Sequence, residues 1–461
     1  MSTRSETDSM GSIEVANNAY WGAQTQRSLH YFAIGEERIP LPVVYALAQI
    51  KKAAARCNAD SGDLDAELGR LIEQACDEVI SGQHDDQFPL SVWQTGSGTQ
   101  SNMNANEVIA NRANELAGQP LGGKKPVHPN DHVNRGQSSN DTFPSAMHLA
   151  ALSETDQHLL PALHGLRDCL AEHAARHQNQ IKIGRTHMMD ATPLTFGQEM
   201  SAFVSQLDLG IEAIEQALPA VCAIAQGGTA VGTGLNAPRG FAQAIADCLS
   251  EQTGLPITSA DNKFAALAGH EPLVRLHGAC KQVAVTLMKL ANDLRLLGSG
   301  PRAGLAEVRL PANEPGSSIM PGKVNPTQCE ALSMLACQVI GNDSSLSMAA
   351  AQGHLQLNVF KPLIIYNLLQ SIRLLADGSN SFRQHCLQGL EVDAEKMREH
   401  LDNSLMLVTA LNPLIGYDKA ADIAKKAWQE GTSLKQAAMA MGYLSEAEFD
   451  QHVQAKHMLG D

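Results

Sequence analysis

One periodic run of apolar residues constrains the fold of this chain more than any other feature of its sequence. Between positions 273 and 297, apolar residues recur at alternating intervals of three and four, at Leu273, Leu276, Cys280, Val283, Leu287, Leu290, Leu294 and Leu297. This spacing is typical of a helix with one face buried against other helices. Pro272 suits the first turn, and Gly298-Ser-Gly-Pro301 ends the run. We therefore predict a helix about 40 Å long, since each residue adds about 1.5 Å.

Three further long helical runs are predicted. The first follows the cap-like Ser139-Asn140-Asp141 and extends from about residue 144 to 177, with Pro161 as the expected site of a kink. The second covers about residues 199–218. The third begins at Asn325-Pro326, interpreted as N-cap and first helical residue, and carries on one face Leu332, Leu335, Ala336, Val339 and Ile340. Shorter amphipathic helices are expected at 418–431 and 434–443.

Composition and length agree with a helical protein of several parts. Hydrophobic residues make up 44% of the chain and aromatic residues only 4%, so aliphatic side chains and alanine must fill the interior, which suits helix packing. A chain of 461 residues is also too long for one compact core. We predict an all-α protein with a loop-rich N-terminal domain (residues 1–137), a central helical bundle (138–361) and a small C-terminal helical domain (362–461).

Charge and cysteine content argue against several classes of protein. The 34 Lys and Arg residues against 49 Asp and Glu residues give a net charge of −15, which disfavours nucleic acid as a partner. No apolar stretch is long enough to span a membrane, and the first residues lack the composition of a signal or transit peptide, so we expect a cytoplasmic protein. The nine cysteines are scattered without a Cys-x-x-Cys pair. We therefore expect reduced thiols, no metal and no cofactor.

Four polar stretches interrupt the helical pattern, and each has a structural as well as a functional interpretation. Thr95–Glu107 and Gln137–Asp141 are rich in Gly, Ser, Thr and Asn, as capped turns are. Gly184–Asp190 contains His187, and a single histidine is more often structural than catalytic. Pro315–Pro326 places a Gly-flanked serine pair before a lysine and a capped helix start. These groups supply donors for an anion, although an ordinary connecting loop is the alternative.

The residues and order of these stretches resemble a known superfamily. The run Gly316-Ser-Ser-Ile-Met-Pro-Gly-Lys-Val-Asn-Pro326 closely resembles the signature of the fumarase/aspartase superfamily, whose members cleave C–N or C–O bonds to release fumarate. The other blocks are matched in the right order by Gly96-Ser-Gly-Thr-Gln-Ser-Asn-Met-Asn104, His128-Pro-Asn-Asp131, Gln137-Ser-Ser-Asn-Asp141 and Gly184-Arg-Thr-His187. The similarity therefore covers nearly the whole chain.

Within the superfamily, the chain resembles the class II fumarases, which are iron-independent. Gly322 and Thr327-Gln-Cys-Glu330 are similar to fumarases, where aspartases have Ala and a different helix start. His187 favours the same group, because aspartases have Gln there and activation of water needs a titratable imidazole. Arg135-Gly136 replaces the Lys-Ser of many relatives but removes no known catalytic group. The resemblance implies reversible hydration of fumarate to (S)-malate in the tricarboxylic acid cycle, through an aci-carboxylate intermediate.

The resemblance also assigns roles to residues. Ser317 is expected to take the C3 proton of malate, on a mobile loop that also holds Ser318. Lys323 and Asn325 are expected to bind the carboxylate on which charge accumulates. His187, paired with Glu330, is expected to hold the water that adds, although Glu330 taken alone is equally well explained as a first-turn acid that stabilises its own helix. The other expected substrate ligands are Ser97, Gly98, Thr99, Ser138, Ser139, Asn140 and Thr186. A second dicarboxylate site is expected at His128, Asn130 and Asp131.

Two other functions stay open, and both use the same fold. One is an ammonia lyase acting on aspartate, and the other is a structural protein that lost the activity. The resemblance also implies a homotetramer in which the long helices form a common core and three chains build each site. A distance supports this expectation, because Asn140 and His187 flank a helical run about 50 Å long at 1.5 Å per residue. Both are expected to contact one four-carbon substrate, so different subunits must supply them.

Overall fold

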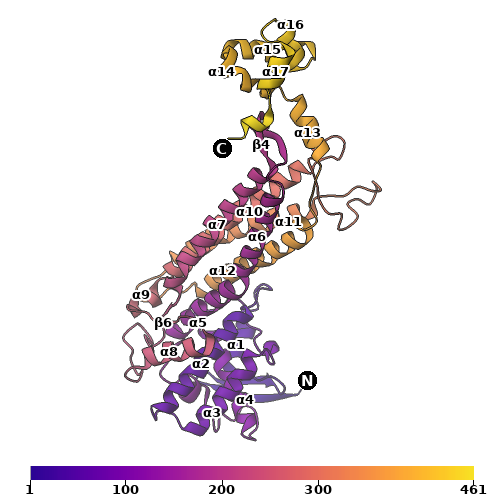
Figure 1. The fold of residues 1–461 in the computed structure, drawn as a ribbon. Coiled ribbons are helices and arrows are strands. Elements are labelled where there is room, and N and C mark those ends of the chain that lie inside the picture. The colour runs from indigo at the N-terminus through magenta and orange to yellow at the C-terminus, as the bar shows by residue number, and fades with distance from the viewer. Residues whose placement is uncertain (1, 461) are drawn as a thin grey trace. The chain divides into compact units, whose positions relative to one another are not determined.

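The computed structural model describes residues 2–460, and most of them lie in helices (Figure 1). The α-helices are α1 (Ala23–Tyr31), α2 (Leu41–Asp60), α3 (Ala66–Ile80), α4 (Thr99–Leu116), α5 (Ser139–Glu154), α6 (Leu160–Arg176), α7 (Phe196–Val221), α8 (Phe241–Thr253), α9 (Lys263–Ala268), α10 (Glu271–Leu297), α11 (Thr327–Ala350), α12 (Lys361–Phe382), α13 (Ala394–Asn403), α14 (Asn412–Ile415), α15 (Tyr417–Glu430), α16 (Leu434–Ala440) and α17 (Glu446–His452). Single π-helical turns cover Pro129–Val133, Thr155–Leu159 and Arg383–Leu387, and short 3-10 helices cover Asp85–Gln87, Leu405–Leu411 and Ala455–Met458. The predicted all-α class is confirmed.

The helix with the periodic apolar face is α10. It begins at Glu271, with Pro272 in its first turn, and ends at Leu297 directly before Gly298. All eight residues of the predicted apolar face are buried. The sequence pattern therefore identified both the helix and the side that packs in the core.

The other predicted long helices are also present. α7 and α11 correspond to the runs predicted from residues 199 and 325, and α11 begins at Thr327, one residue after Pro326. The π-helical turn at residues 155–159 joins α5 to α6, so helical backbone continues from Ser139 to Arg176. This turn ends two residues before Pro161, which lacks the N–H group that a regular helix uses for its hydrogen bond. The irregularity at Pro161 is therefore a π turn.

The described residues form two compact units, and both are discontinuous in sequence. The first unit consists of the chain up to Pro161, residues 210–284 and residues 335–376. The second consists of residues 162–209, 285–334 and the chain from Asp377 onward. The first unit holds α1–α5, α8 and α9, and the second holds α13–α17. The predicted domain boundaries after residues 137 and 361 stay a prediction. They lie where the sequence pattern changes, whereas the two units are defined by how compactly the residues pack in space.

The structure also contains short strands that the apolar pattern does not predict. β1 (Thr3–Asp8) pairs antiparallel with β2 (Gly11–Ala16), and β3 (Ile181–Thr186) pairs antiparallel with β4 (Met189–Thr195). The pairs β5 (Ala223–Ile224) with β6 (Thr258–Ser259) and β7 (Val308–Arg309) with β8 (Glu391–Val392) have two residues in each strand. The β3–β4 hairpin carries His187, one of the predicted catalytic residues, at its turn.

The C-terminal helices have a small core of their own. Its buried residues are Val408, Leu411, Ala420, Ile423, Ala427, Leu434, Ala437, Ala438, Leu444 and Phe449. α15 and α16 correspond to the amphipathic helices predicted at 418–431 and 434–443. α15 begins one residue earlier than predicted, and α16 begins at the predicted residue. None of the helices in residues 2–460 is long and apolar enough to cross a membrane.

Candidate functional site

The starts of two neighbouring helices in the first unit hold six of the predicted substrate ligands. Residues 97–99 lie at the start of α4 and residues 138–140 at the start of α5. One turn into α4, the Asn102 Nδ2 donates a hydrogen bond of 2.9 Å to the Ser139 Oγ. The structure thus brings the two groups of ligands together. The first N–H groups of a helix have no partner within it, and the helix dipole is positive at this end, so the arrangement favours an anion.

Close packing explains the glycines of the loop before α4. Gly98 has a φ of +77°, and a Cβ atom added there would lie 2.3 Å from the ring of Phe143 in α5. A Cβ atom on Gly96 would lie 1.3 Å from the carbonyl oxygen of Val359. Only glycine fits at both positions. The buried Ser97 between them is therefore held in one place.

A buried carboxylate, Asp141, anchors the start of α5. Its Oδ1 accepts the N–H of Ser138, and its Oδ2 accepts the N–H groups of Gly227 and Thr229, all three at 2.9 Å. Burial raises the pKa of Asp141, and the backbone donors oppose that shift. Asp141 therefore holds the helix start against a loop that lies about ninety residues further along the chain.

That loop, Gly227–Gly234, is a part of the site that the sequence analysis did not single out. The carbonyl of Ala230 accepts a hydrogen bond of 2.9 Å from the Asn140 Nδ2. An amide NH₂ has two hydrogens, so this bond leaves one donor of Asn140 unused. Four glycines occur among the eight residues of the loop, a density that indicates a tight turn in any sequence. The signal was therefore available without the structure.

A buried lysine holds the segment before α5 through hydrogen bonds. Lys51 of α2 is fully buried, and its Nζ lies 2.8 Å from the Asn134 Oδ1 and 2.9 Å from the Gln137 Oε1. Burial lowers the pKa of Lys51 to about 7, and the nearby negative charge of Asp141 opposes the shift. The Asn134 Oδ1 also accepts from Asn102 of α4. One polar network thus connects α2, α4 and the segment that carries residues 138–140.

In the second unit, the predicted base Ser317 lies in a loop without regular secondary structure. Its Oγ accepts hydrogen bonds from the N–H groups of Ile319, at 3.2 Å, and Met320, at 3.0 Å. Hydrogen bonds to an oxygen favour its negatively charged form. These two donors are therefore the kind that would help Ser317 to act as a base.

The same loop is closed at its base and exposed at its tip. The N–H of Gly316 donates to the carbonyl of Lys323 over 2.9 Å, and the Asn325 Nδ2 donates to the carbonyl of Gly316 over 2.7 Å. Ser318 and Lys323 are exposed, and Ile319 at the tip is 84% exposed. The Lys323 ammonium is therefore available to an external anion, whereas one hydrogen of the Asn325 amide is used within the loop.

Thr186 and His187 lie at the exposed tip of the β3–β4 hairpin. The two turn residues, His187 and Met188, both have positive φ, at 55° and 63°. A two-residue turn of this kind matches the twist of paired strands, although it usually contains Gly or Asn. Within residues 2–460 of one chain, no hydrogen bond or ion pair joins His187 to Glu330 or to Ser317. The pair of His187 with Glu330 stays a prediction.

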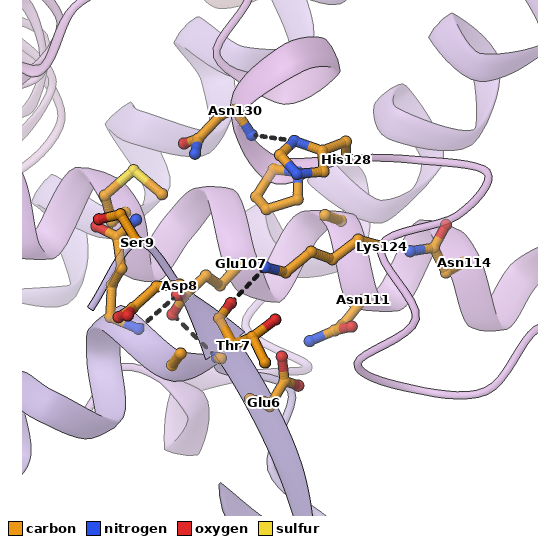
Figure 2. Close-up of a pocket in the computed structure, with 16 residues that line it drawn as sticks. Glu6, Thr7, Asp8, Ser9, Glu107, Asn111, Asn114, Lys124, His128 and Asn130 are labelled. Carbon is orange, nitrogen blue, oxygen red and sulfur yellow. Dashed lines mark hydrogen bonds between the residues drawn. The ribbon is translucent and has the colours of Figure 1, made fainter. Parts of the chain in front are cut away.

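The predicted second-site residues form a capped π-helical turn. The His128 Nδ1 accepts the N–H groups of Asn130 and Asp131, at 3.2 and 3.1 Å. His128 and Asn130 border a cavity of about 270 Å³ between β1, α4 and the loop before the turn (Figure 2). Three carboxylates, from Glu6, Asp8 and Glu107, line this cavity, and Figure 2 shows Lys124 reaching across it to the carbonyl of Thr7. Its charge does not suit a dicarboxylate.

The described residues offer no built metal site. Across residues 2–460, no three side chains of His, Cys, Asp or Glu lie close enough together to hold a metal ion. All nine cysteines are free thiols. The polar groups that the structure brings together at the starts of α4 and α5 are hydroxyls, amides and backbone N–H groups, which can donate hydrogen bonds to an anion.

Comparison with known proteins gives consistent relatives over the whole length. Two family models match, one described as lyase over residues 11–341 and one as fumarase C C-terminus over residues 407–460. The chain is 71% identical to the class II fumarate hydratase of Pseudomonas putida and 70% identical to class II fumarate hydratase 1 of Pseudomonas aeruginosa, in each case over 99% of this chain and 98% of the relative. Its fold matches the crystal structure of recombinant class II fumarase from Schistosoma mansoni with a TM-score of 0.97 and 48% identity, covering 99% of both chains.

Proposed function

Because this chain belongs to the class II fumarate hydratase family, we propose that it catalyses the reversible addition of water to fumarate, giving (S)-malate. The observation that carries the proposal is the near-complete alignment with class II fumarate hydratases. The geometry around Ser317 agrees with it, since this reaction needs a base at C3 of malate.

In the proposed mechanism, Ser317 removes the C3 proton of malate. The N–H groups of Ile319 and Met320 stabilise the serine oxygen when it carries negative charge. Proton removal places a second negative charge on the neighbouring carboxylate, and the exposed Lys323 ammonium with Asn325 binds this aci-carboxylate. The hydroxyls and amides at the starts of α4 and α5 hold the other carboxylate without cancelling its charge.

His187 favours hydration over release of ammonia. Loss of hydroxide from malate requires a group that donates a proton to the leaving oxygen, and in the reverse direction the same group must accept a proton from water. An imidazole does both near neutral pH. We assign this role to His187, with Glu330 as its partner. An aspartate ammonia-lyase is the second candidate, and it needs no proton donor at this position because an ammonium group leaves as ammonia.

Absorbance of fumarate tests the function. Purified protein is given malate, aspartate or neither substrate, and formation of the fumarate double bond is followed in the ultraviolet. We expect fumarate from malate alone. Ser317→Ala and His187→Asn should each reduce kcat at least about a hundredfold, as loss of an acid–base group does, with far-UV circular dichroism unchanged. The proposal is contradicted if folded protein forms fumarate from aspartate, or if it forms no fumarate from either malate or aspartate.

We further propose a homotetramer whose active sites are shared between chains. The support is the length of the helical segment between two sets of ligands in the sequence, Ser139 to Arg176. At about 1.5 Å per residue such a segment is far longer than a four-carbon substrate. Residues that flank it, Asn140 and His187, are therefore assigned to one site through different copies of the chain.

Mixed assembly tests the shared site. Equal amounts of inactive Asn140→Ala and His187→Asn variants are dissociated together and reassembled at random. If two chains supply the two residues, one site in about four receives both intact side chains, by one half times one half, and activity returns in that proportion. Mass spectrometry of the intact assembly verifies that mixed tetramers form. Verified mixed tetramers without activity contradict the shared site.

We propose that the predicted second dicarboxylate site lies on the side of the π-helical turn Pro129–Val133 that faces basic residues. A second cavity beside His128 is lined by Lys124, Lys125 and His132 as well as Asp131. Its cations suit a dicarboxylate better than the acidic cavity of Figure 2 does.

The nine free thiols suit a reducing compartment, and we propose that the protein lies in the cytoplasm.

A further inference from the structure

A buried carboxylate, Glu307, contacts the strand that leads to His187. Its Oε1 accepts a hydrogen bond of 2.7 Å from the Arg185 Nη2, and its Oε2 lies 2.8 Å from the Lys182 Nζ. The second contact is an ion pair without the angles of a hydrogen bond. Both basic residues belong to β3, and the Glu307 and Lys182 side chains are essentially inaccessible to solvent. A buried charge is held only where such partners compensate it.

The backbone of Glu307 is fixed independently of its side chain. Its N–H donates to the carbonyl of Leu297 at the end of α10, and its carbonyl accepts from the N–H of Asp393, both at 2.9 Å. The two residues that follow form β7, which pairs with β8. The carboxylate therefore projects from a rigid segment. That segment lies ten residues before Ser317 in the chain, at the entrance to its loop.

The hairpin tip, in contrast, does not hold itself in place. His187 and Met188 both adopt left-handed backbone conformations, which persist in non-glycine residues only when the surroundings maintain them. His187 is exposed, and its side chain makes no hydrogen bond or ion pair within residues 2–460 of its own chain. The position of its imidazole therefore depends on how the strands behind it are anchored.

We propose that Glu307 is a positioning residue for the proposed hydration reaction, which holds β3 through Lys182 and Arg185 and so places His187. The inference rests on the proposed function of His187 and deepens it. Burial acts to raise the pKa of Glu307, but Arg185 and Lys182 outweigh burial and lower the pKa overall, so the carboxylate is ionised at neutral pH. It therefore pulls on both basic residues of the strand.

The chain contains a matched control in Glu199. This residue of α7 also pairs with Lys182, at 2.8 Å, but its side chain is partly exposed, and among the described residues no hydrogen bond or ion pair joins it to Arg185. In Glu307→Gln, Glu199 still compensates the Lys182 charge, so β3 loses its ion pairs with Glu307 without leaving a buried lysine unpaired. In Glu199→Gln, both ion pairs of Glu307 with β3 stay in place.

Steady-state kinetics with malate distinguish the two variants. We expect Glu307→Gln to lower kcat at least about tenfold, because a catalytic group displaced by about 1 Å loses up to about a hundredfold in rate. Its KM should change less than about threefold, since most predicted carboxylate ligands lie outside the hairpin. Glu199→Gln should keep kcat within about twofold, as expected for a partly exposed ion pair. Glu307→Asp, which restores the charge, should recover part of the lost kcat.

Hydrogen–deuterium exchange of residues 181–195 provides a readout that does not depend on activity. Exchange in the hairpin should rise in Glu307→Gln and in Arg185→Gln, and stay at the wild-type level in Glu199→Gln. Arg185→Gln also serves if Glu307→Gln does not fold, because Arg185 is nearer the surface. Wild-type kcat and exchange in Glu307→Gln overturn the inference, as do equal losses in Glu199→Gln. A wild-type protein inactive on malate overturns the proposed function instead, and the exchange result then still decides the role of Glu307.

Discussion

Replacing Asp141 by Asn tests how the start of α5 is held. The substitution keeps the size and shape of the side chain but turns one of its two oxygens into an NH₂ group. Three backbone N–H groups, from Ser138, Gly227 and Thr229, point at these oxygens. Whichever way the amide is oriented, at least one buried N–H then faces another donor. We expect a less stable protein in which the start of α5 is held more weakly.

The magnitude follows from the hydrogen bonds that change. In the better orientation, the NH₂ faces Ser138, and one buried donor is left unsatisfied at a cost of about 1–3 kcal/mol. The two bonds that stay become neutral rather than charge-assisted, each weaker by about 1 kcal/mol. Removing a buried charge offsets part of this loss, because burial raises the pKa of Asp141 and so disfavours its ionised form. The expected loss of unfolding free energy is therefore about 2–4 kcal/mol.

Asp65→Asn is the matched control for this measurement. Asp65 caps α3 by accepting the N–H groups of Glu67 and Leu68, but it does so at the surface. Asn is about as good an N-cap as Asp, so the expected change is below about 0.5 kcal/mol. Urea denaturation followed by circular dichroism compares the two variants with the wild type. Equal denaturation midpoints for Asp141→Asn and Asp65→Asn would refute the role given to Asp141.

Three further predictions concern a buried lysine, a tightly packed glycine and the expected independence from metal. The pKa of Lys51 is 10.5 in the unfolded chain and about 7 in the fold, so the unfolded state binds more protons between these values and stability rises with pH there. Thermal denaturation from pH 7 to 10 should show this rise in the wild type and a weaker one in Lys51→Met; parallel curves count against it. Gly96→Ala forces the backbone away from Val359, and kcat/KM for malate should fall at least about tenfold. An unchanged kcat/KM would contradict this prediction. Exhaustive EDTA treatment should leave malate dehydration intact, and recovery of a lost activity by one added metal would disprove this.

Sequence pattern predicted the parts of the fold that depend on local periodicity. The apolar face of α10 is readable because its residues recur at helical intervals, and Pro272 and Gly298 mark both ends. The loop that carries Ser317 is readable because its serine pair, glycines and lysine form a dense signature. In both cases a short stretch of sequence contains all of the information.

The β3–β4 hairpin escaped prediction for a local reason. Its turn residues, His187 and Met188, adopt positive φ without being Gly or Asn, so the usual turn signal is absent. The register of its strands also shifts between Ile183 and Arg185, which obscures the alternation of a strand.

Other parts of the site depend on contacts between distant segments. Asp141 bonds to residues about ninety positions away, and Lys51 reaches Asn134 and Gln137 from α2. Nothing in the sequence near Lys51 distinguishes it from an exposed lysine. A single sequence reveals such partners only after the fold is known, because periodicity reports which face is buried and not what it meets.

Nuclear magnetic resonance in D₂O tests the proposed reaction by identifying its product. The protein is incubated with fumarate and an excess of ammonium chloride, so that water and ammonia compete for the double bond. Hydration adds one deuterium to C3 and a deuteroxyl group to C2, and we predict malate that carries a single carbon-bound deuterium, with no aspartate. Aspartate as the product, or fumarate left unchanged by folded protein, would contradict the proposed function.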